Sequence, residues 1–310
     1  MEFLLSEDQL ALAETVRDYL AGTHGPDVLR RLDEAGSRDP AIWQGLVDMG
    51  LTGLLVPSEH GGLGLTLLDA ALVARECGRA ALAEPLVDAA FVAVPWILAN
   101  GKTADMEAIV AGTVRPAAAH AINPWVADGD GPPLESVDPL RRLAAPVTAG
   151  TEDPYLLDLG ALMAAAQLVG AAEAMLHQSV EYAKVRTQFG QPIGAFQAVK
   201  HQLATATVGI EFARPVLWRA AQALADRLPS APVHVSHAKV AAGDAAIAMA
   251  ETAIQIHGAM GYTYEVDLHF WMKRSWALAG AWGSRAWHIR RLESAIVGGS
   301  HPIGPDHTFA

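Results

Sequence analysis

Apolar residues recur three or four positions apart along most of this chain, which is the spacing of one face of an α-helix. In the first hundred residues this pattern predicts a helix after Ser6, a good N-cap, and a second helix beginning near Pro40. Two further helices are predicted over about 66–78 and 86–99. The segment 50–65 separates the second helix from the third, and its five glycines and one proline predict a loop.

The middle of the chain has a different character from the helical parts on either side. Between residues 115 and 154 lie seven of the eighteen prolines, no helical spacing survives, and a short strand is indicated only near 144–147. This stretch is too short for a complete β-domain and predicts a reduced connector. Helical spacing returns at Tyr155, and helices are predicted over about 156–188, 196–228, 233–257, 266–278 and 284–297.

The expected fold is therefore mostly α. We predict an N-terminal helical domain over 1–112, a reduced middle β-domain or connector over 113–154, a C-terminal helical bundle over 155–300 and a tail over 301–310. Hydrophobic residues make up 51% of the chain and charged residues 18%, which is enough for a sizeable core. Aromatic residues are only 6%, and this favours packed helices over a β-sandwich.

Charge and cysteine content exclude several classes of partner. The net charge of −12 argues against a nucleic acid or an anionic membrane as the binding partner. The N-terminus carries acids where a secretory signal would carry a basic stretch. The one cysteine, Cys77, allows neither an intrachain disulfide nor a thiolate metal site, and it fits a cytoplasmic location. The twelve histidines form no HExxH motif, so we expect no metal site.

Two segments carry more specific signals. In the first, Arg186 ends one predicted helix and Gln197 begins the next, so an arginine would lie beside free backbone N–H groups, as a pyrophosphate site requires. In the second, a helix ends near Gln255 in a glycine-rich turn, where the backbone can approach a ligand closely. Taken alone, each segment is equally well explained as a simple turn.

Together, in this order and about seventy residues apart, the two segments resemble the acyl-CoA dehydrogenase family. That family carries R-x-x-FG-x-PI-x-x-FQ followed by Q-x-x-GG-x-GY. Here the two motifs are Arg186–Gln197 and Gln255–Tyr262, with Ala259 in place of the second glycine. The segment Trp43–Leu65 also resembles the N-terminal domain of the family. The resemblance covers about 1–100 and 155–300.

The resemblance implies a helical N-terminal domain, a middle β-domain and a C-terminal four-helix bundle. It also implies FAD, a dimer-based tetramer, and α,β-dehydrogenation of an acyl-CoA thioester, in which a carboxylate removes the α-proton while the flavin accepts a hydride. In the family, one subunit contacts the adenylate half of its neighbour's FAD. The residues implied in that contact are Arg186, Phe189, Gln197, Gln255, Gly258 and Ala259.

This chain departs from the family at the catalytic base. The family uses two positions for it, and the corresponding residues here are Trp282, in LAGAWGS, and Gly160, in LDLGALM. Neither residue can take a proton. No acid lies between Ser275 and Arg291 or between Leu159 and Ala172, so an alignment error of a few positions leaves the conclusion unchanged. We therefore expect no catalytic residue in this chain.

The missing base and the reduced middle domain belong to the parts with which a subunit of the family contacts its own flavin ring and its own substrate. The pattern therefore resembles the short non-catalytic subunit of a heteromeric acyl-CoA dehydrogenase, as in bacterial steroid side-chain degradation. It implies a full-length partner subunit that bears the catalytic Glu and holds most of the acyl-CoA, FAD shared at the subunit interface, and no activity of this chain alone. Two alternatives stay open: an independent homo-oligomeric flavoenzyme using Glu265 or Asp267, and a non-enzymatic scaffold protein that kept the fold.

Overall fold

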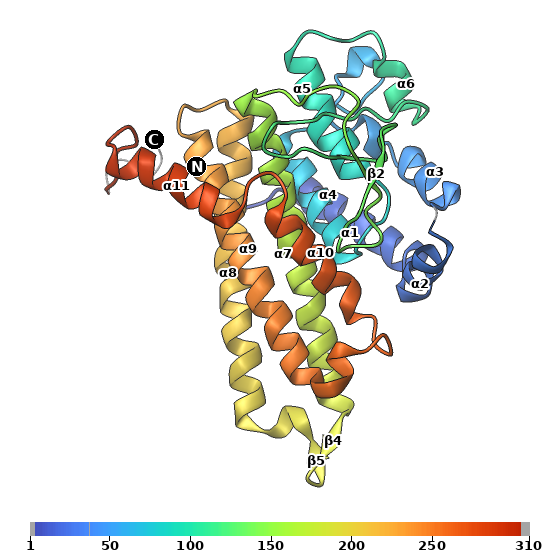
Figure 1. The fold of residues 1–310 in the computed structure, drawn as a ribbon, viewed down its shortest axis with the longest axis vertical. Helices are drawn as coiled ribbons and strands as arrows, with labels where there is room; N and C mark the ends of the chain where they lie inside the picture. Colours follow the sequence, from blue (N-terminus) through green and yellow to red (C-terminus); the bar gives the residue numbers. More distant parts are fainter. Residues whose placement is uncertain (1–3, 37, 305–310) are drawn as a thin grey trace.

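The N-terminal third forms a layer of short helices against a long helical bundle. The computed structural model describes residues 4–36 and 38–304, and Figure 1 shows this layer in blue and cyan beside the upper half of the bundle. Its helices are α1 (Glu7–Thr23), α2 (Pro26–Ala35), α3 (Pro40–Asp48), α4 (Leu67–Arg79), the π-helix η3 (Val87–Ala93), α5 (Val94–Ala99) and α6 (Met106–Val110). Two 3₁₀ turns, η1 (Leu51–Gly53) and η2 (Ser58–His60), lie in the loop predicted over 50–65.

Local capping explains where several of these helices begin. Ser6 and Gln9 form a reciprocal capping box at the start of α1, and Thr66 and Asp69 form another at α4. Proline occupies the first position of α3, where its missing N–H is not needed. The four helices predicted in this part are confirmed, whereas α2 and α6 were not predicted.

The middle part holds a very small sheet. Strands β1 (Val126–Ala127), β2 (Pro133–Leu134) and β3 (Leu143–Ala144) pair antiparallel in the order β1-β3-β2. The strand expected near 144–147 therefore ends earlier than predicted. Three two-residue strands confirm that the middle β-domain is strongly reduced.

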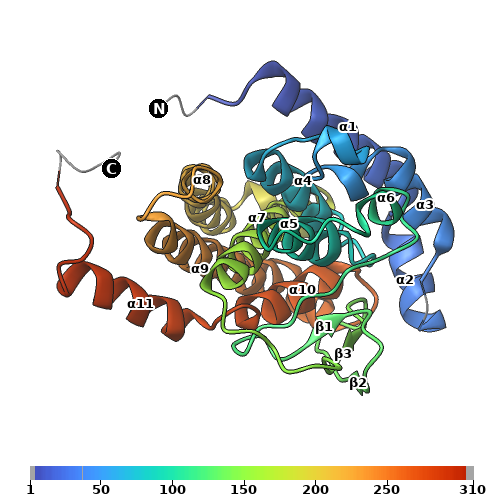
Figure 2. The same cartoon turned by 90° about the horizontal axis from the view of Figure 1, so that it is seen from above.

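The C-terminal half is a four-helix bundle with an appended helix. The bundle helices are α7 (Pro154–Val185), α8 (Gln197–Ala225), α9 (Ala231–His257) and α10 (Leu268–Gly280). A hairpin of β4 (Thr187–Gln188) and β5 (Gln191–Pro192), followed by the 3₁₀ turn η4 (Ile193–Ala195), joins α7 to α8, and the 3₁₀ helix η5 (Gly258–Tyr262) follows α9. The last helix, α11 (Arg285–Val297), contacts α9 and then extends sideways beyond the bundle (Figure 2).

Helix α7 is the central element of the molecule. Its length and composition would suffice to cross a membrane, but 94% of its most apolar window is buried inside the protein, as in a core helix. Two glycines let α4 approach it closely, because a Cβ on Gly78 would lie 2.1 Å from the Gln167 carbonyl oxygen and one on Gly170 would lie 1.8 Å from the Arg75 carbonyl oxygen.

One hydrophobic core joins all parts of the chain. It contains residues from the N-terminal helices, Leu140 from the connector, and the inner faces of the bundle. The domain boundaries 1–112, 113–154 and 155–300 therefore stay a prediction, since the packing is continuous across them. Of the predicted tail 301–310, only residues 301–304 lie within the described part of the chain.

Candidate functional site

The two motif segments lie at the same end of the bundle. The hairpin β4–β5 forms the lower tip of the molecule in Figure 1, and η5 follows the lower end of α9. Tyr182, near the end of α7, stacks on His257, the last residue of α9, with the ring centroids 4.3 Å apart. Segments separated by about seventy residues in the sequence are therefore joined by a direct ring contact.

Arg186 and Phe189 lie on the projecting hairpin. The Arg186 N–H donates to the Tyr182 carbonyl oxygen, and the Arg186 carbonyl accepts from the Ile193 N–H at 2.8 Å, which closes the base of the hairpin. Phe189 and Gly190 both have positive φ, at +52° and +80°, as the central residues of a tight hairpin turn require. Phe189 is 92% exposed, so its ring is presented to whatever packs against this tip.

Gln197 begins α8, and this helix start is uncapped. Phe196 precedes it with no side-chain capping bond, and within the described residues the N–H groups of Gln197, Ala198 and Val199 make no hydrogen bond. Free N–H groups at the start of a 29-residue helix favour an anion. Arg186 lies at the other end of the same short connection and adds a full positive charge.

Gln255, Gly258 and Ala259 form the second part of the predicted site. Gly258 ends α9 with φ +60° and ψ −137°, a conformation that residues with a Cβ rarely adopt. Ala259 is not among the residues with positive φ, so its methyl group is compatible with the backbone there. All six predicted cofactor residues are exposed in this chain. The side chains of Arg186, Gln197 and Gln255 make no hydrogen bond within residues 4–36 and 38–304.

The two positions expected for a catalytic base contact each other. Trp282 follows α10, and its indole lies on Gly160 in the second turn of α7: a Cβ on Gly160 would lie 2.0 Å from Cδ2 of that indole. Trp282 is only 4% exposed. The cavity left beside it measures about 10 Å³, which is the space of at most one water molecule.

Three buried groups hold Trp282 in this position. The backbone N–H of Trp282 donates to the Asn123 Oδ1 at 3.0 Å, and the backbone carbonyl oxygen of Trp282 lies 3.0 Å from Nε2 of His288. Burial lowers the pKa of His288 to about 4, so the ring is neutral and donates from Nε2. The Lys239 Nζ donates to the Leu278 and Ala279 carbonyls, both at 2.9 Å, and fixes the end of α10.

The acids of the homo-oligomeric alternative, and the acid nearest to Gly160, differ in their surroundings. Glu265 is exposed, and Asp267 forms an ion pair with Arg30. Asp158, two residues before Gly160, is buried, and burial raises its pKa, but it is held by Arg291.

Glu84 is a buried acid that no motif in the sequence had indicated as a functional residue. Its two carboxylate oxygens have no hydrogen-bond partner among the described residues. Burial raises the pKa of Glu84, and the nearest cation is Arg115 Nη1 at 3.8 Å.

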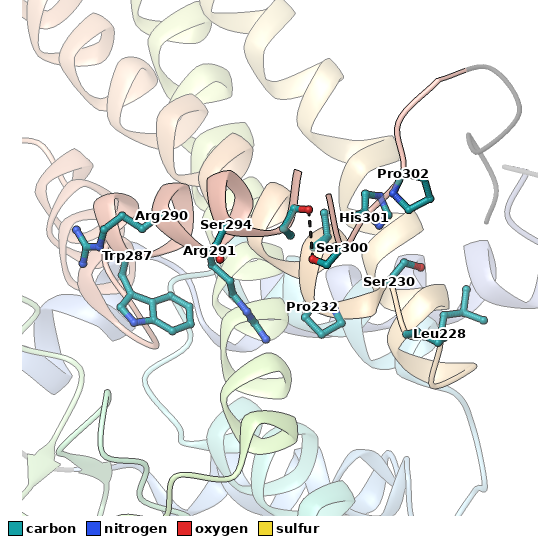
Figure 3. Close-up of a pocket in the computed structure, with 13 residues that line it drawn as sticks. Leu228, Ser230, Pro232, Trp287, Arg290, Arg291, Ser294, Ser300, His301 and Pro302 are labelled. Carbon is teal, nitrogen blue, oxygen red and sulfur yellow. Dashed lines mark hydrogen bonds between the residues drawn. The ribbon is translucent and has the colours of Figure 1, made fainter. Parts of the chain in front are cut away.

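A cavity of about 820 Å³ lies between the start of α9 and α11 (Figure 3). Arg291, on its wall, is paired with Asp158, and Ser300 donates to the Ala295 carbonyl. Arg290 is turned away from the residues of α9 (Figure 3). Arg290 still belongs to the wall of this cavity, and within the described residues its guanidinium makes no hydrogen bond or ion pair. Within the described residues no group of three His, Cys, Asp or Glu side chains is arranged to bind a metal.

Comparisons with known proteins identify the family. The acyl-CoA dehydrogenase N-terminal domain matches residues 6–123, and the acyl-CoA dehydrogenase C-terminal domain matches residues 155–296. The acyl-CoA dehydrogenase IpdE2 of Mycobacterium tuberculosis is 34% identical over 94% of this chain and 98% of its own length. This chain belongs to the acyl-CoA dehydrogenase family. Members of this family are FAD-dependent oxidoreductases.

Solved structures of the family have the same fold. A variant of the Tcur3481–Tcur3483 steroid acyl-CoA dehydrogenase superposes with a TM-score of 0.84 at 22% identity, covering 96% of this chain and 99% of that one. A chain of the ChsE4–ChsE5 complex from Mycobacterium tuberculosis superposes with a TM-score of 0.82 at 22% identity, covering 98% and 100%. At this identity the likeness extends to the fold only.

The acyl-CoA dehydrogenase cofactor fits one part of this chain and not another. The uncapped start of α8 and the unpaired Arg186 suit the pyrophosphate of FAD. By contrast, the strands β1, β2 and β3 of the middle part have two residues each and provide little surface against which a flavin ring could pack. Trp282 fills the space beside Gly160. The free N–H groups at the start of α8 and the Arg186 side chain therefore have the chemistry to bind a pyrophosphate.

Proposed function

We propose that this chain is the flavin-supporting subunit of a heteromeric acyl-CoA dehydrogenase. It contributes the trans half of the FAD site, and a full-length partner subunit supplies the catalytic Glu and most of the acyl-CoA site. The chain is inactive alone, and the complex works in the cytoplasm. The substrate is an acyl-CoA thioester, and the steroid acyl-CoA dehydrogenase among the similar structures supports a steroid side-chain ester.

The observation that carries this proposal is the contact between Trp282 and Gly160. Both positions at which the family resemblance expects a carboxylate are occupied, one by an indole and the other by the glycine that accommodates it. A site that holds a thioester must have room for it and a base within reach of the α-proton. The indole occupies the space beside Gly160 and neither residue is a base, which supports a reaction that depends on a second subunit.

The exposed motif residues support the other half of the proposal. Bound FAD supplies the hydride acceptor of the reaction. Arg186 and the N–H groups at the start of α8 hold its pyrophosphate, and Gln255 and the turn at Gly258 contact its adenylate half. Phe189, at the hairpin tip, packs against the partner and excludes water from this contact. The two proteins with similar folds that are named as pairs, ChsE4–ChsE5 and Tcur3481–Tcur3483, support a heteromeric assembly.

The test is co-expression with a full-length acyl-CoA dehydrogenase of the same organism, followed by flavin absorbance and turnover of the purified complex. The complex is expected to be yellow and active, and this chain alone inactive. Arg186→Ala should weaken FAD binding by the complex roughly 10- to 100-fold, because a hydrogen bond to a charged group contributes about 1.5–3 kcal/mol. Lys184→Ala, which removes an exposed charge two residues earlier, is the matched control and should leave FAD affinity almost unchanged.

Two results would contradict the proposal. One is turnover of acyl-CoA by a homogeneous preparation of this chain at ordinary enzymatic rates. The other is a complex whose FAD affinity is the same with Arg186→Ala as with Lys184→Ala. Failure to bind FAD with any partner would favour the scaffold alternative.

A further inference from the structure

A second cavity, of about 350 Å³, lies where α1 and α2 meet α4, α7 and α10. None of the six predicted cofactor residues lines it. Much of its wall is apolar, from Leu20, Ala21, Pro26, Ala174 and Trp271. Its ionisable wall residues are Arg17, His24, Glu76, Arg79 and His177.

The Glu76 carboxylate below this cavity is contacted by three arginines. Arg17 donates to both of its oxygens, from Nε at 3.0 Å and from Nη2 at 3.1 Å. Arg75 Nε donates at 3.1 Å, and Arg79 Nε lies 3.1 Å away. Burial raises the pKa of Glu76, but the hydrogen bonds and charges of the arginines outweigh burial, so this pKa is lowered. The carboxylate is therefore ionised at neutral pH.

The guanidinium groups of this network are balanced by carboxylates. The second buried carboxylate, Glu173, accepts from Arg79 and from Arg214 Nε at 2.7 Å. Four guanidinium groups thus surround two buried carboxylates, and the exposed Glu211 and Glu14 add negative charge beside Arg214 and Arg17. A ligand at this place would therefore be bound by donors that the carboxylates leave unused.

Unused donors remain at the cavity. Arg17 and Arg79 are 41% and 30% exposed, and the Nη1 group of each makes no hydrogen bond within residues 4–36 and 38–304. His24 is only 3% exposed, and its Nε2 accepts from the Ala83 N–H at 3.2 Å. The proton of the neutral ring is therefore on Nδ1, which is buried without a partner among the described residues.

We propose that this cavity binds a small organic anion, namely a monocarboxylate with a short alkyl chain. The free Nη1 groups of Arg17 and Arg79 bind the carboxylate, since planar guanidinium groups match that geometry. The alkyl chain lies against the apolar wall. A chain of about six to eight carbons is expected, because the volume lies at the lower end of the range of ligand sites. This site is separate from the cofactor role proposed above, so either proposal can fail without the other.

The test is isothermal titration calorimetry of the purified full-length chain with octanoate. Saturable binding at one site is expected. Arg17→Met should weaken it roughly 10- to 100-fold, as for the loss of a charge-assisted hydrogen bond. Ala21→Phe should abolish it, because Ala21 is an exposed wall residue and a larger side chain there fills the cavity. Arg31→Met and Ala11→Phe alter exposed residues that do not line the cavity and should bind as the unmodified chain does.

Two further probes separate the charge from the alkyl chain. Octanol has the chain without the carboxylate, and inorganic phosphate has charge without the chain, so each should bind at least about tenfold more weakly than octanoate. Absence of saturable octanoate binding would overturn the proposal. Equal binding of octanol or of phosphate would do so as well, as would unchanged binding by a folded Ala21→Phe variant. Circular dichroism of each variant establishes that it is folded, and Ala21→Phe provides the test if Arg17→Met is unstable.

Discussion

The contact between Gly160 and Trp282 can be tested by adding a single methyl group. In Gly160→Ala the new Cβ would lie 2.0 Å from Cδ2 and 2.4 Å from both Cε2 and Cε3 of the indole. These are inner ring atoms of a buried side chain held by backbone hydrogen bonds, so the ring cannot turn aside cheaply. Overpacking of this kind costs about 1–3 kcal/mol. Alanine gains about 0.5–1 kcal/mol over glycine inside a helix, so Gly160→Ala should lower the free energy of unfolding by up to about 2.5 kcal/mol.

The matched control is Gly243→Ala in the middle of α9. No atom lies within 4 Å of the Cβ added at this glycine, so only the helix preference changes. This variant should be about 0.5–1 kcal/mol more stable than the unmodified chain. Equilibrium unfolding in urea, followed by circular dichroism, measures the free energy of unfolding of both variants. Thermal unfolding of Gly160→Ala should show a Tm lower by up to roughly 10 °C.

A double-mutant cycle identifies the indole as the cause. Trp282→Ala alone should cost about 3–5 kcal/mol, because it empties a buried site. In that background Gly160→Ala should be neutral or stabilising, which gives a coupling of about 1–3 kcal/mol between the two positions. If Gly160→Ala instead stabilises the unmodified chain as much as Gly243→Ala does, the indole does not lie on Gly160. The argument for a closed catalytic site would then be refuted.

Three further outcomes follow from buried groups. Arg274→Met should lower the free energy of unfolding, measured in urea, by about 3–5 kcal/mol. The substitution leaves Asp138, the buried ion-pair partner of Arg274, without a compensating charge. Burial lowers the pKa of Lys239 from 10.5 to about 7. Between pH 7 and pH 10.5 the unfolded chain therefore binds more protons than the folded chain does. Stability should therefore rise with pH across this window by up to about 1.4 kcal/mol per pH unit, and Lys239→Met should flatten the rise. Burial raises the pKa of the Cys77 thiol to about 12, so DTNB at pH 8 should label it only in the unfolded chain.

The sequence predicts the helices well because their signals are local. Ser6 and Pro40 mark helix starts through capping and through φ, and both act within one turn. Helix α2 was not predicted because it is only ten residues long, near the lower length at which apolar spacing identifies a helix, and buries only Leu29 and Leu32. The π-helix Val87–Ala93 lies inside a correctly predicted helical stretch, but a shift in hydrogen-bond register leaves no mark on side-chain spacing.

Only part of the candidate site could be predicted from the sequence. The motifs at 186–197 and 255–262 are local patterns, and the family resemblance connected them; the Tyr182–His257 stacking that joins them is a tertiary contact. The octanoate cavity had no sequence signal at all. The arginines and glutamates around it come from four different helices, α1, α4, α7 and α8, and single charged residues at such separations form no pattern.

Gly160 and Trp282, the two positions at which the family resemblance expects a base, are coupled by direct packing. A glutamate at 160 would direct its side chain into the volume that the Trp282 indole occupies, since even its Cβ would lie within 2.0 Å of the ring. A carboxylate at position 160 therefore requires a smaller residue than tryptophan at position 282. Gly160→Glu alone would bury an unpaired charge against an indole, which is strongly unfavourable. Recovery of a carboxylate at position 160 therefore needs a compensating change at position 282, which fits the proposed dependence on a partner subunit.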